Sequence, residues 1–308
     1  MGYQLYFVVS ILSGILLYSI QKIFIYYKKF DDFNHRSSHK TLATRTGGIA
    51  IFTTLLIVSS YYYFNSIELF DYSLFIPIGI MFIVGVYDDF YHADFKLKFL
   101  LQIIVAKIII DQGYFISNYH GLFGLYEVPW ILAQLTTVFV FLVIINAINF
   151  MDGIDGLAIT EVIKTIFLLE FFSKSQTPLT LLFTLLILCL VPLYYFNFKR
   201  KRKIFLGDGG SLLLGTMVSI YIFYLLGDQY VFKKGYQINK VIFGIMVILY
   251  PLLDLLRVFI LRIKNGRSPF TADQNHLHHL LVKKGITHKL IVLIIFTSSL
   301  SIFCFTIL

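Results

Sequence analysis

Charged residues are scarce in this chain of 308 residues, since Asp, Glu, Lys and Arg together make up only 14% of it. A soluble domain carries about 25% charged residues. Hydrophobic residues make up 58%, and the mean hydropathy is +0.79. A soluble protein of this composition would need a very large core with almost no polar surface, so the composition favours an integral membrane protein.

Cysteine is almost absent. Cys189 and Cys304 both lie inside apolar runs, which excludes a disulfide framework and a cysteine-based metal site. The apolar N-terminal run has no basic start and no small-residue cleavage site. We therefore expect a retained first membrane span and no cleaved signal peptide.

Apolar runs with lengths near the roughly 20 residues that a bilayer requires recur along the chain. They fall at about 3–26, 47–64, 72–87, 97–111, 129–149, 157–172, 178–197, 211–227, 238–262 and 289–308. None alternates with period two, which argues against a β-barrel. Neither a linker nor an internal repeat interrupts them. The sequence predicts a single all-α domain, residues 1–308, that forms a polytopic membrane bundle of about ten transmembrane helices.

Basic residues collect in alternate loops. We number the loops between these apolar runs from the N-terminus. The odd-numbered loops carry the basic clusters, at Lys28 to Arg45, Lys96 and Lys98, Lys199 to Lys203, and Arg262 to Lys289. The even-numbered loops carry only Lys174, Lys233, Lys234 and Lys240. The positive-inside rule predicts cytoplasmic odd loops and both termini extracytoplasmic. This topology accounts for the net charge of +9 without a nucleic-acid partner. The run Lys199–Lys203 is interpreted as a topology anchor, with a secondary role at anionic lipid headgroups.

The other polar residues lie on the same predicted face. The third loop opens with "GVYDDF" (Asp88, Asp89), the fifth is "NAINFMDGIDGLA" (Asn146, Asn149, Asp152, Asp155), the seventh ends with "FLGDGGSLLLG" (Asp208), and the ninth contains "SPFTADQNHLHHLL" (Asp273, His276, His278, His279). Each has a structural explanation, such as a helix cap or an interfacial histidine, and "HLHH" alone is a weak zinc signal. Four such features on one face favour a catalytic surface.

Phosphoryl transfer suits these groups. A pyrophosphate substrate brings charge that Mg²⁺ (or Mn²⁺) neutralises, usually held by one or two carboxylates. The remaining aspartates would bind the substrate or handle protons. On a helix, Asp152 and Asp155 would share one face, as would Asn146 and Asn149. Inside the spans, Asp254 with Arg257 and Glu161 with Lys164 are predicted to neutralise each other.

The combined motifs resemble the polyprenyl-phosphate N-acetylhexosamine-1-phosphate transferases. The matching order is "GG-I-A", "G-x-x-D-D", "N-x-x-N-x-x-D-G-x-D-G-L-A", "G-D-x-G-S" and "D-x-x-H-x-H-H", over about residues 28–285. "NHRSSHKTLATRTGGIAI", from Asn34 to Ile51, is similar to the form in O-antigen or capsule initiators. The usual "P-T-P-R" is here "A-T-R-T", and Arg45 comes one place early.

This resemblance implies transfer of N-acetylhexosamine-1-phosphate from a UDP-sugar to undecaprenyl phosphate, with release of UMP and a requirement for Mg²⁺. It implies catalytic roles for Asp88, Asp89 and His279, metal ligation by Asp208 and Asp89, and nucleotide contacts from Asn149, Asp152 and Asp155. Substrate contacts are also expected from a set comprising Asn146, His276, His278, Arg267 and Arg45. The active site would lie on the cytoplasmic face of a bacterial inner (plasma) membrane, beside membrane lipid.

Several alternatives stay open. The peptidoglycan enzyme of the same superfamily, the phospho-MurNAc-pentapeptide transferase, shares the motifs. A transporter would instead carry acidic residues at mid-span and repeated halves. The sequence names neither the sugar (GlcNAc, GalNAc, FucNAc and QuiNAc all fit) nor the pathway, such as lipopolysaccharide O-antigen biosynthesis. It leaves open a direct or covalent mechanism and the oligomeric state, a homodimer included.

Overall fold

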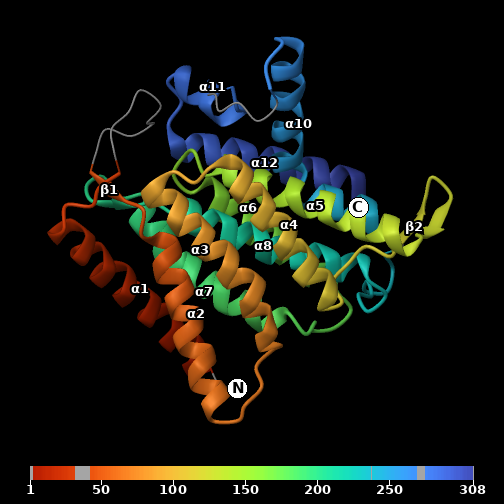
Figure 1. Ribbon diagram of the computed structural model, residues 1–308, viewed down its shortest axis with the longest axis horizontal. Coiled ribbons are helices and arrows are strands. Elements are labelled where there is room, and N and C mark those ends of the chain that lie inside the picture. The colour runs from red at the N-terminus through yellow and green to blue at the C-terminus, as the bar shows by residue number, and fades with distance from the viewer. Residues whose placement is uncertain (1–2, 32–41, 237, 269–274, 308) are drawn as a thin grey trace.

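The computed structural model describes residues 3–31, 42–236, 238–268 and 275–307 (Figure 1). Its helices are α1 (Tyr3–Tyr26), α2 (Gly47–Phe64), α3 (Phe75–Tyr91), α4 (Phe95–Asp111), α5 (Trp130–Met151), α6 (Leu157–Phe172), α7 (Thr180–Asn197), α8 (Gly207–Leu226), α9 (Lys240–Val247), α10 (Leu249–Lys264), α11 (Leu277–Lys283) and α12 (His288–Ile307). A 3-10 turn, η1 (Tyr72–Leu74), precedes α3. The strands are β1 (Ala43–Thr44), β2 (Asn118–Leu122), β3 (Leu125–Glu127) and β4 (Lys203–Ile204). The motif residues 34–41, Ser37 among them, and Asp273 lie outside the described residues.

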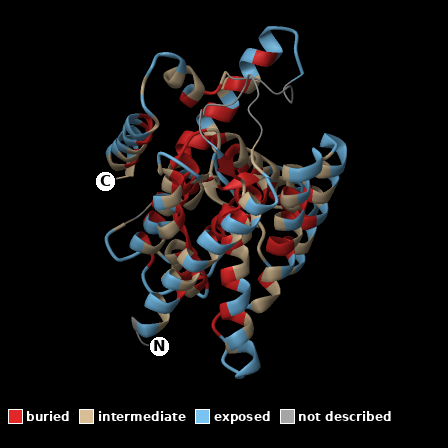
Figure 2. Ribbon diagram, turned by 90° about the vertical axis from the view of Figure 1, so that its left-hand side faces the viewer, coloured by how far each residue is buried: buried red, intermediate tan, exposed pale blue. Residues whose placement is uncertain are grey.

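Helix α8 forms the centre of the bundle. It is apolar around its whole circumference, which is typical of a helix without a solvent-facing or lipid-facing side. Helices α2, α3, α5, α6 and α9 pack around it. Figure 2 shows buried positions gathered along the interior and exposed positions on the outer faces and ends. The N-terminus of α8, which carries Asp208, therefore opens at one end of the bundle among residues from its neighbours.

Helices form at all ten predicted apolar runs, but the count of about ten spans is not confirmed. Among the described residues, seven helices are long and apolar enough to cross a membrane, and an eighth candidate is the bent pair α9–α10. Helices α4 and α6 have only 17 and 16 residues. At 1.5 Å per residue they measure about 25 Å, less than the hydrocarbon core of a bilayer. The coarser prediction of a helical, multi-pass membrane protein holds.

The helix predicted at 238–262 is broken in two, because α9 and α10 meet at an angle of 77°. Ile248, between them, has φ −114° and ψ 27°, outside the helical region. Pro251 explains the break: it has no N–H to donate to the carbonyl four residues earlier, and its ring clashes with that carbonyl. The bend turns α10 out of the bundle, so that α10 and α11 rise above the other helices (Figure 1).

The odd-numbered loops meet at one end of the bundle, which we call the basic face. Strand β1, in the first loop, pairs in parallel with β4, in the seventh, through Ala43–Lys203 and Thr44–Ile204. The Gln21 side chain donates to the carbonyls of Arg202 and Lys203, which fixes the seventh loop to α1. Near the opposite end, β2 and β3 form an antiparallel hairpin that the sequence analysis did not anticipate. Which side of the membrane the basic face occupies remains a prediction.

Candidate active site

Asp89 binds the N-terminus of α8. Its carboxylate accepts hydrogen bonds from the backbone N–H groups of Asp208 (3.0 Å) and Gly209 (3.1 Å). Arg45 donates to the same carboxylate over 3.3 Å. The first N–H groups of a helix have no intrahelical acceptor, and the helix dipole favours a negative charge beside them. Asp89 therefore joins the third loop to the seventh and fixes the position of Asp208.

Asp88 points in another direction, because consecutive residues on a helix are about 100° apart. Its carboxylate accepts hydrogen bonds from the Lys98 ammonium (2.5 Å) and the Ala93 backbone (2.8 Å). It also contacts the carboxyl group of Asp208, and Lys98 lies 3.8 Å from that second carboxyl. Two carboxyl groups in contact require a shared proton or a nearby cation. Asp88, Asp208 and Lys98 thus form one cluster, with Asp89 behind it.

Asn149 completes this cluster from α5. Its amide donates to the carboxylate of Asp208 (2.8 Å) and to the Ser211 hydroxyl (2.7 Å). Gly85 sets the spacing on the α3 side, because a Cβ there would lie 2.2 Å from the Asp208 carbonyl oxygen. Only glycine allows α3 to approach α8 so closely. The positions of Asp88 and Asp208 therefore depend on the close packing of α3, α5 and α8.

Asp152 and Asp155 lie in the turn between α5 and α6, so the prediction that they share a helical face is wrong. Asp152 interacts electrostatically with Asp208 and Asp89. Burial, followed by the charges of Asp208 and Asp89, raises its pKa well above the usual range for an aspartate. A cation near these carboxylates would reverse that effect.

Asp155 has a different environment. Its buried carboxylate forms an ion pair with Lys203 and contacts the Nδ1 atom of His288 at 2.9 Å. Burial alone would raise the pKa of Asp155, but hydrogen bonds from His288 and Lys203 outweigh it and hold the pKa below its usual value. Asp155 therefore links the fifth loop to the seventh loop and to the start of α12, and its carboxylate is already occupied.

The histidine motif is anchored by Asp254 on α10. The Asp254 carboxylate contacts His276 Nδ1 (2.8 Å) and accepts a hydrogen bond from the Leu277 backbone (2.8 Å). Arg257 donates to the same carboxylate over 3.0 Å. The predicted neutralisation of Asp254 by Arg257 is confirmed, as is that of Glu161 by Lys164 at 2.5 Å. Asp254 additionally orients the histidines, a role that the sequence analysis missed.

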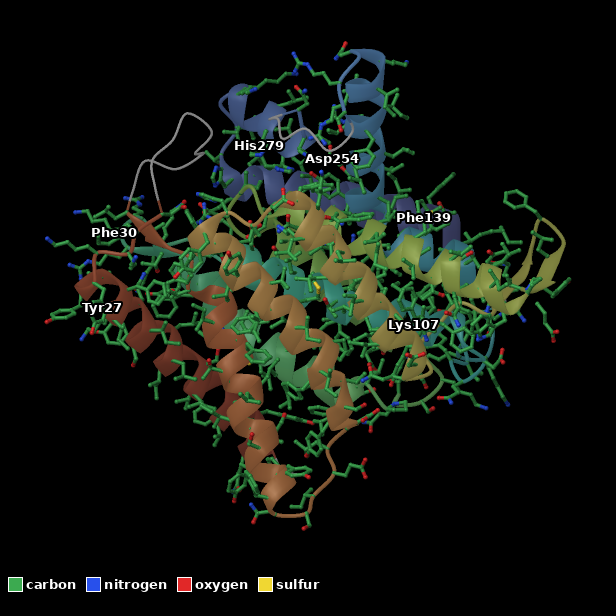
Figure 3. All side chains as sticks on the ribbon, viewed as in Figure 1. Tyr27, Phe30, Lys107, Phe139, Asp254 and His279 are labelled. Carbon is green, nitrogen blue, oxygen red and sulfur yellow. The ribbon has the colours of Figure 1, made fainter. Side chains whose placement is uncertain are left out.

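His278 and His279 cover the fifth loop. Their rings lie 4.4 Å apart, and a Cβ on Gly153 would come within 2.8 Å of both. His278 is fully buried, with Nδ1 3.2 Å from the Tyr250 hydroxyl. Burial and the neighbouring histidines lower the pKa of His278 to about 3 and that of His279 to about 4. Both imidazoles are therefore neutral near pH 7. Figure 3 shows His279 and Asp254 together at the end of the molecule from which α10 projects.

Two predicted substrate residues stand apart from this cluster. Asn146 donates to Gln102 on α4 (2.9 Å) and to the Leu142 carbonyl (2.8 Å), so it joins α5 to α4. Arg267 is exposed just beyond the end of α10. The other predicted residues lie in or beside the cluster of Asp88, Asp208 and Lys98, in the turn at 152–156, or in the histidine motif that covers this turn.

The residues that sequence reasoning missed are mainly basic. Lys98, Lys203 and His288 each contact one of the predicted aspartates, but in the sequence Lys98 and Lys203 resemble only topology signals. Their spacing from the aspartates has no helical period, because the contacts cross between elements. The only signal for them was that they lie in the same predicted loops as the polar motifs.

The donor set fits Mg²⁺ better than a metal held by protein ligands alone. Within the described ranges, no group of three or more His, Cys, Asp or Glu side chains converges as a metal site. Mg²⁺ is usually bound by one or two carboxylates, with water and substrate phosphates as the other ligands. The adjoining carboxyl groups of Asp88 and Asp208, with the Asn149 amide beside them, provide such a partial set.

Comparison with known proteins identifies the family of this chain. The profile of glycosyl transferase family 4 matches residues 71–226. A Bacillus subtilis (strain 168) protein described as a probable undecaprenyl-phosphate N-acetylglucosaminyl 1-phosphate transferase is 30% identical over 298 residues, covering 94% of this chain and 80% of the relative. The undecaprenyl-phosphate alpha-N-acetylglucosaminyl 1-phosphate transferase of Salmonella typhi is 28% identical over 294 residues (91% of this chain, 76% of the relative). Its Escherichia coli (strain K12) counterpart is 28% identical over 269 residues (83% and 70%).

Proposed function

Because the chain belongs to glycosyl transferase family 4, we propose that it transfers N-acetylhexosamine-1-phosphate from a UDP-sugar to undecaprenyl phosphate and releases UMP. The names of its relatives support this reaction and favour N-acetylglucosamine as the sugar. They also favour it over the peptidoglycan enzyme and over a transporter. The product, a diphosphate-linked lipid sugar, would begin the membrane stage of a surface polysaccharide pathway.

The observation that carries the proposal is the cluster of Asp88, Asp208 and Lys98 at the N-terminus of α8. The two carboxyl groups belong to different helices, and Asp89 and Gly85 fix the distance between those helices. Phosphoryl transfer demands little covalent chemistry from the protein and depends on positioning and charge. A rigid set of charges at the end of a membrane bundle meets that requirement.

Asp88 and Asp208 would hold Mg²⁺, which supplies positive charge to the pyrophosphate of the donor, and the Asn149 amide would hold the Asp208 carboxylate in place. Lys98 would then exchange a carboxylate partner for a substrate phosphate. Arg45 contacts Asp89 at 3.3 Å and adds a second fixed cation. His279 is neutral near pH 7 and can therefore donate or accept a hydrogen bond at a phosphate oxygen.

The acceptor phosphate is itself a nucleophile. An oxygen of this phosphate would attack the phosphorus adjacent to the sugar, and the bond from that phosphorus to the UMP oxygen would break. No covalent enzyme intermediate is needed, since correct positioning of two bound phosphates supplies most of the rate enhancement.

The reaction is tested by measuring UMP release from UDP-N-acetylglucosamine by purified protein with undecaprenyl phosphate and Mg²⁺. Turnover should disappear with EDTA and return with Mg²⁺ or Mn²⁺. Parallel assays with UDP-GalNAc and with UDP-MurNAc-pentapeptide test sugar choice. If no UDP-sugar yields UMP, the enzyme proposal fails.

We also propose that the basic face lies in the cytoplasm, where UDP-sugars occur. Its lysines and arginines support this orientation. The test places single cysteines at Lys201, on this face, and at Phe123, which is 92% exposed in the β2–β3 hairpin, after replacement of Cys189 and Cys304. In intact cells, an impermeant maleimide should label only the Phe123→Cys variant. The reverse pattern would invert the topology.

A further inference from the structure

A groove lies between α7 and α12 near the basic face. Its volume is about 750 Å³, and Thr160 of α6 lies in its lining. The walls are otherwise mainly apolar and aromatic, formed by Val191, Tyr194, Tyr195, Val292, Leu293 and Phe296. Val191 and Leu293 are each 55% exposed. The groove therefore offers an extended apolar surface to a hydrocarbon chain.

Two lysines also line this groove, Lys199 and Lys289. The Lys199 ammonium lies 4.3 Å from the ring centre of Phe196, and that of Lys289 lies 5.8 Å from the ring centre of Phe198. Among the described residues, no carboxylate is within 4.0 Å of either ammonium. Both cations are therefore available to an anion at the groove.

A second concavity of about 300 Å³ adjoins the first and shares Lys199. The other cations in its lining are Lys22, Arg200, Lys201 and Arg202, and none of the described residues in the lining is acidic. Gln21 is buried and holds the backbone of Arg202 and Lys203 against α1. The cations of the seventh loop are thus held in place beside Lys22 of α1, and the mutual repulsion of these cations would be relieved by a bound anion.

The groove is separate from the candidate active site. The Phe198 ring packs against Gly156, where a Cβ would lie 2.4 Å from it, and so closes the groove toward the turn at 152–156. Within that turn, Asp155 contacts Lys203 and His288 and so connects the neighbouring elements. Of the residues described, those that line the groove do not include Asp88, Asp208 or Lys98.

We infer that the groove between α7 and α12 binds an anionic membrane phospholipid, with its phosphate at Lys199 and Lys289 and an acyl chain against Val191 and Leu293. The apolar walls suit the chain, and the unneutralised lysines select the charge. A lysine near a membrane surface favours an anionic over a zwitterionic lipid roughly fivefold. The site is distinct from the acceptor-lipid site that the proposed reaction requires.

The test uses tryptophan fluorescence. The chain has one tryptophan, Trp130, which lies at the start of α5. In a Trp130→Phe background, Leu293→Trp places a reporter in the groove. Ile83→Trp on α3, where Ile83 is 63% exposed, places a control on another outward-facing surface. Each protein is reconstituted in phosphatidylcholine vesicles doped with brominated phosphatidylglycerol or, at the same mole fraction, brominated phosphatidylcholine.

The groove reporter should be quenched more strongly by the anionic lipid, with a lipid preference of at least roughly fivefold, and the Ile83→Trp reporter should show no preference. Lys199→Gln with Lys289→Gln should abolish the preference. Lys174→Gln with Lys234→Gln, the same loss of charge in even-numbered loops, should leave it intact.

Three results would overturn the inference. Equal quenching by both lipids would show that the groove does not prefer the anionic lipid. Protection from both would mean that protein, such as a second copy of the chain, covers the groove. Recovery of fluorescence on adding undecaprenyl phosphate would make the acceptor lipid the occupant. None of these readouts depends on turnover, so the lipid site and the proposed reaction fail independently.

Discussion

The Asp89 carboxylate accepts the backbone N–H of Asp208, 3.0 Å away, across the interface between α3 and α8. This bond fixes the first turn of the central helix relative to the helix that carries Asp88. The two adjacent aspartates of the "GVYDDF" motif therefore have separate tasks in this structure. Asp89 positions Asp208, whereas Asp88 meets the Asp208 side chain in the cluster.

Asp88→Asn and Asp89→Asn should separate these tasks. The Asp89 carboxylate accepts two backbone N–H bonds, whereas the amide in Asp89→Asn has one acceptor oxygen and one NH₂ group that only donates. The free energy of unfolding should therefore fall by about 1–3 kcal/mol. UMP release should fall with it. Asp88→Asn should abolish UMP release with a smaller loss of stability, because Asp88 is only partly buried.

Thermal unfolding and UMP release of both variants, measured in one detergent, check this prediction. Asp208→Asn should resemble Asp88→Asn in lacking activity. Equal stability losses in Asp88→Asn and Asp89→Asn would contradict the division of roles.

Gly85→Ala tests how much the site depends on close helix packing. The added Cβ would lie 2.2 Å from the Asp208 carbonyl oxygen, so α3 and α8 must separate. Overpacking of this kind costs about 1–3 kcal/mol, and it should also displace Asp88 from Asp208 and lower kcat. Gly14→Ala is the matched control, because its Cβ would lie 3.9 Å from Pro192, an ordinary contact. Unchanged activity and stability in Gly85→Ala would show that the interface adapts.

The helices and their common face could be predicted from the sequence, because both follow from local composition. Each predicted apolar run contains a helix, and the basic odd-numbered loops do meet at one end, as the pairing of Ala43 with Lys203 illustrates. The break at Ile248 was also present in the sequence as Pro251, but a run of apolar residues concealed it. Their shorter length and their charged residues separate α4 and α6 from the spanning helices.

The partners within the site could not be predicted. Lys98 reaches Asp88 and Asp208 only because α4 packs beside α3, and side-chain direction there depends on the angle between helices. Likewise, Asp152 and Asp155 are equivalent in a Gly-rich motif, and only the fold brings Lys203 and His288 to Asp155. Sequence patterns identify the residue types of a site, whereas packing assigns their contacts.

Asp155→Asn and Asp152→Asn should have different effects. Asp155→Asn leaves Lys203 and His288 without their buried partner, which should lower the free energy of unfolding by about 3 kcal/mol. Asp111→Asn is its matched control, since it breaks an ion pair with Lys107 in which both side chains are exposed and should change stability little.

Asp152→Asn should leave the free energy of unfolding unchanged. It should raise the KM for the UDP-sugar about tenfold, which is the effect of losing one charge-assisted hydrogen bond. Thermal unfolding and steady-state UMP release distinguish the two substitutions. The opposite assignment, with stability lost at Asp152 and KM raised at Asp155, would contradict the structure.

Acid should weaken the contact between the histidine motif and the fifth loop. The pKa values of His278 and His279 are lowered to about 3 and about 4 in the folded protein, whereas an unfolded histidine titrates near 6.5. Between pH 6.5 and 4 the unfolded chain therefore binds more protons than the folded chain, so stability falls as the pH falls. The slope reaches about 1.4 kcal/mol per pH unit for each histidine. Asp152, with its raised pKa, contributes the opposite sign, so the comparison must be made between variants. Melting temperatures at pH 7.5 and 5.5 should fall more steeply for the native chain than for the His278→Asn, His279→Asn double variant, and parallel slopes would show that the two imidazoles are protonated in the folded state.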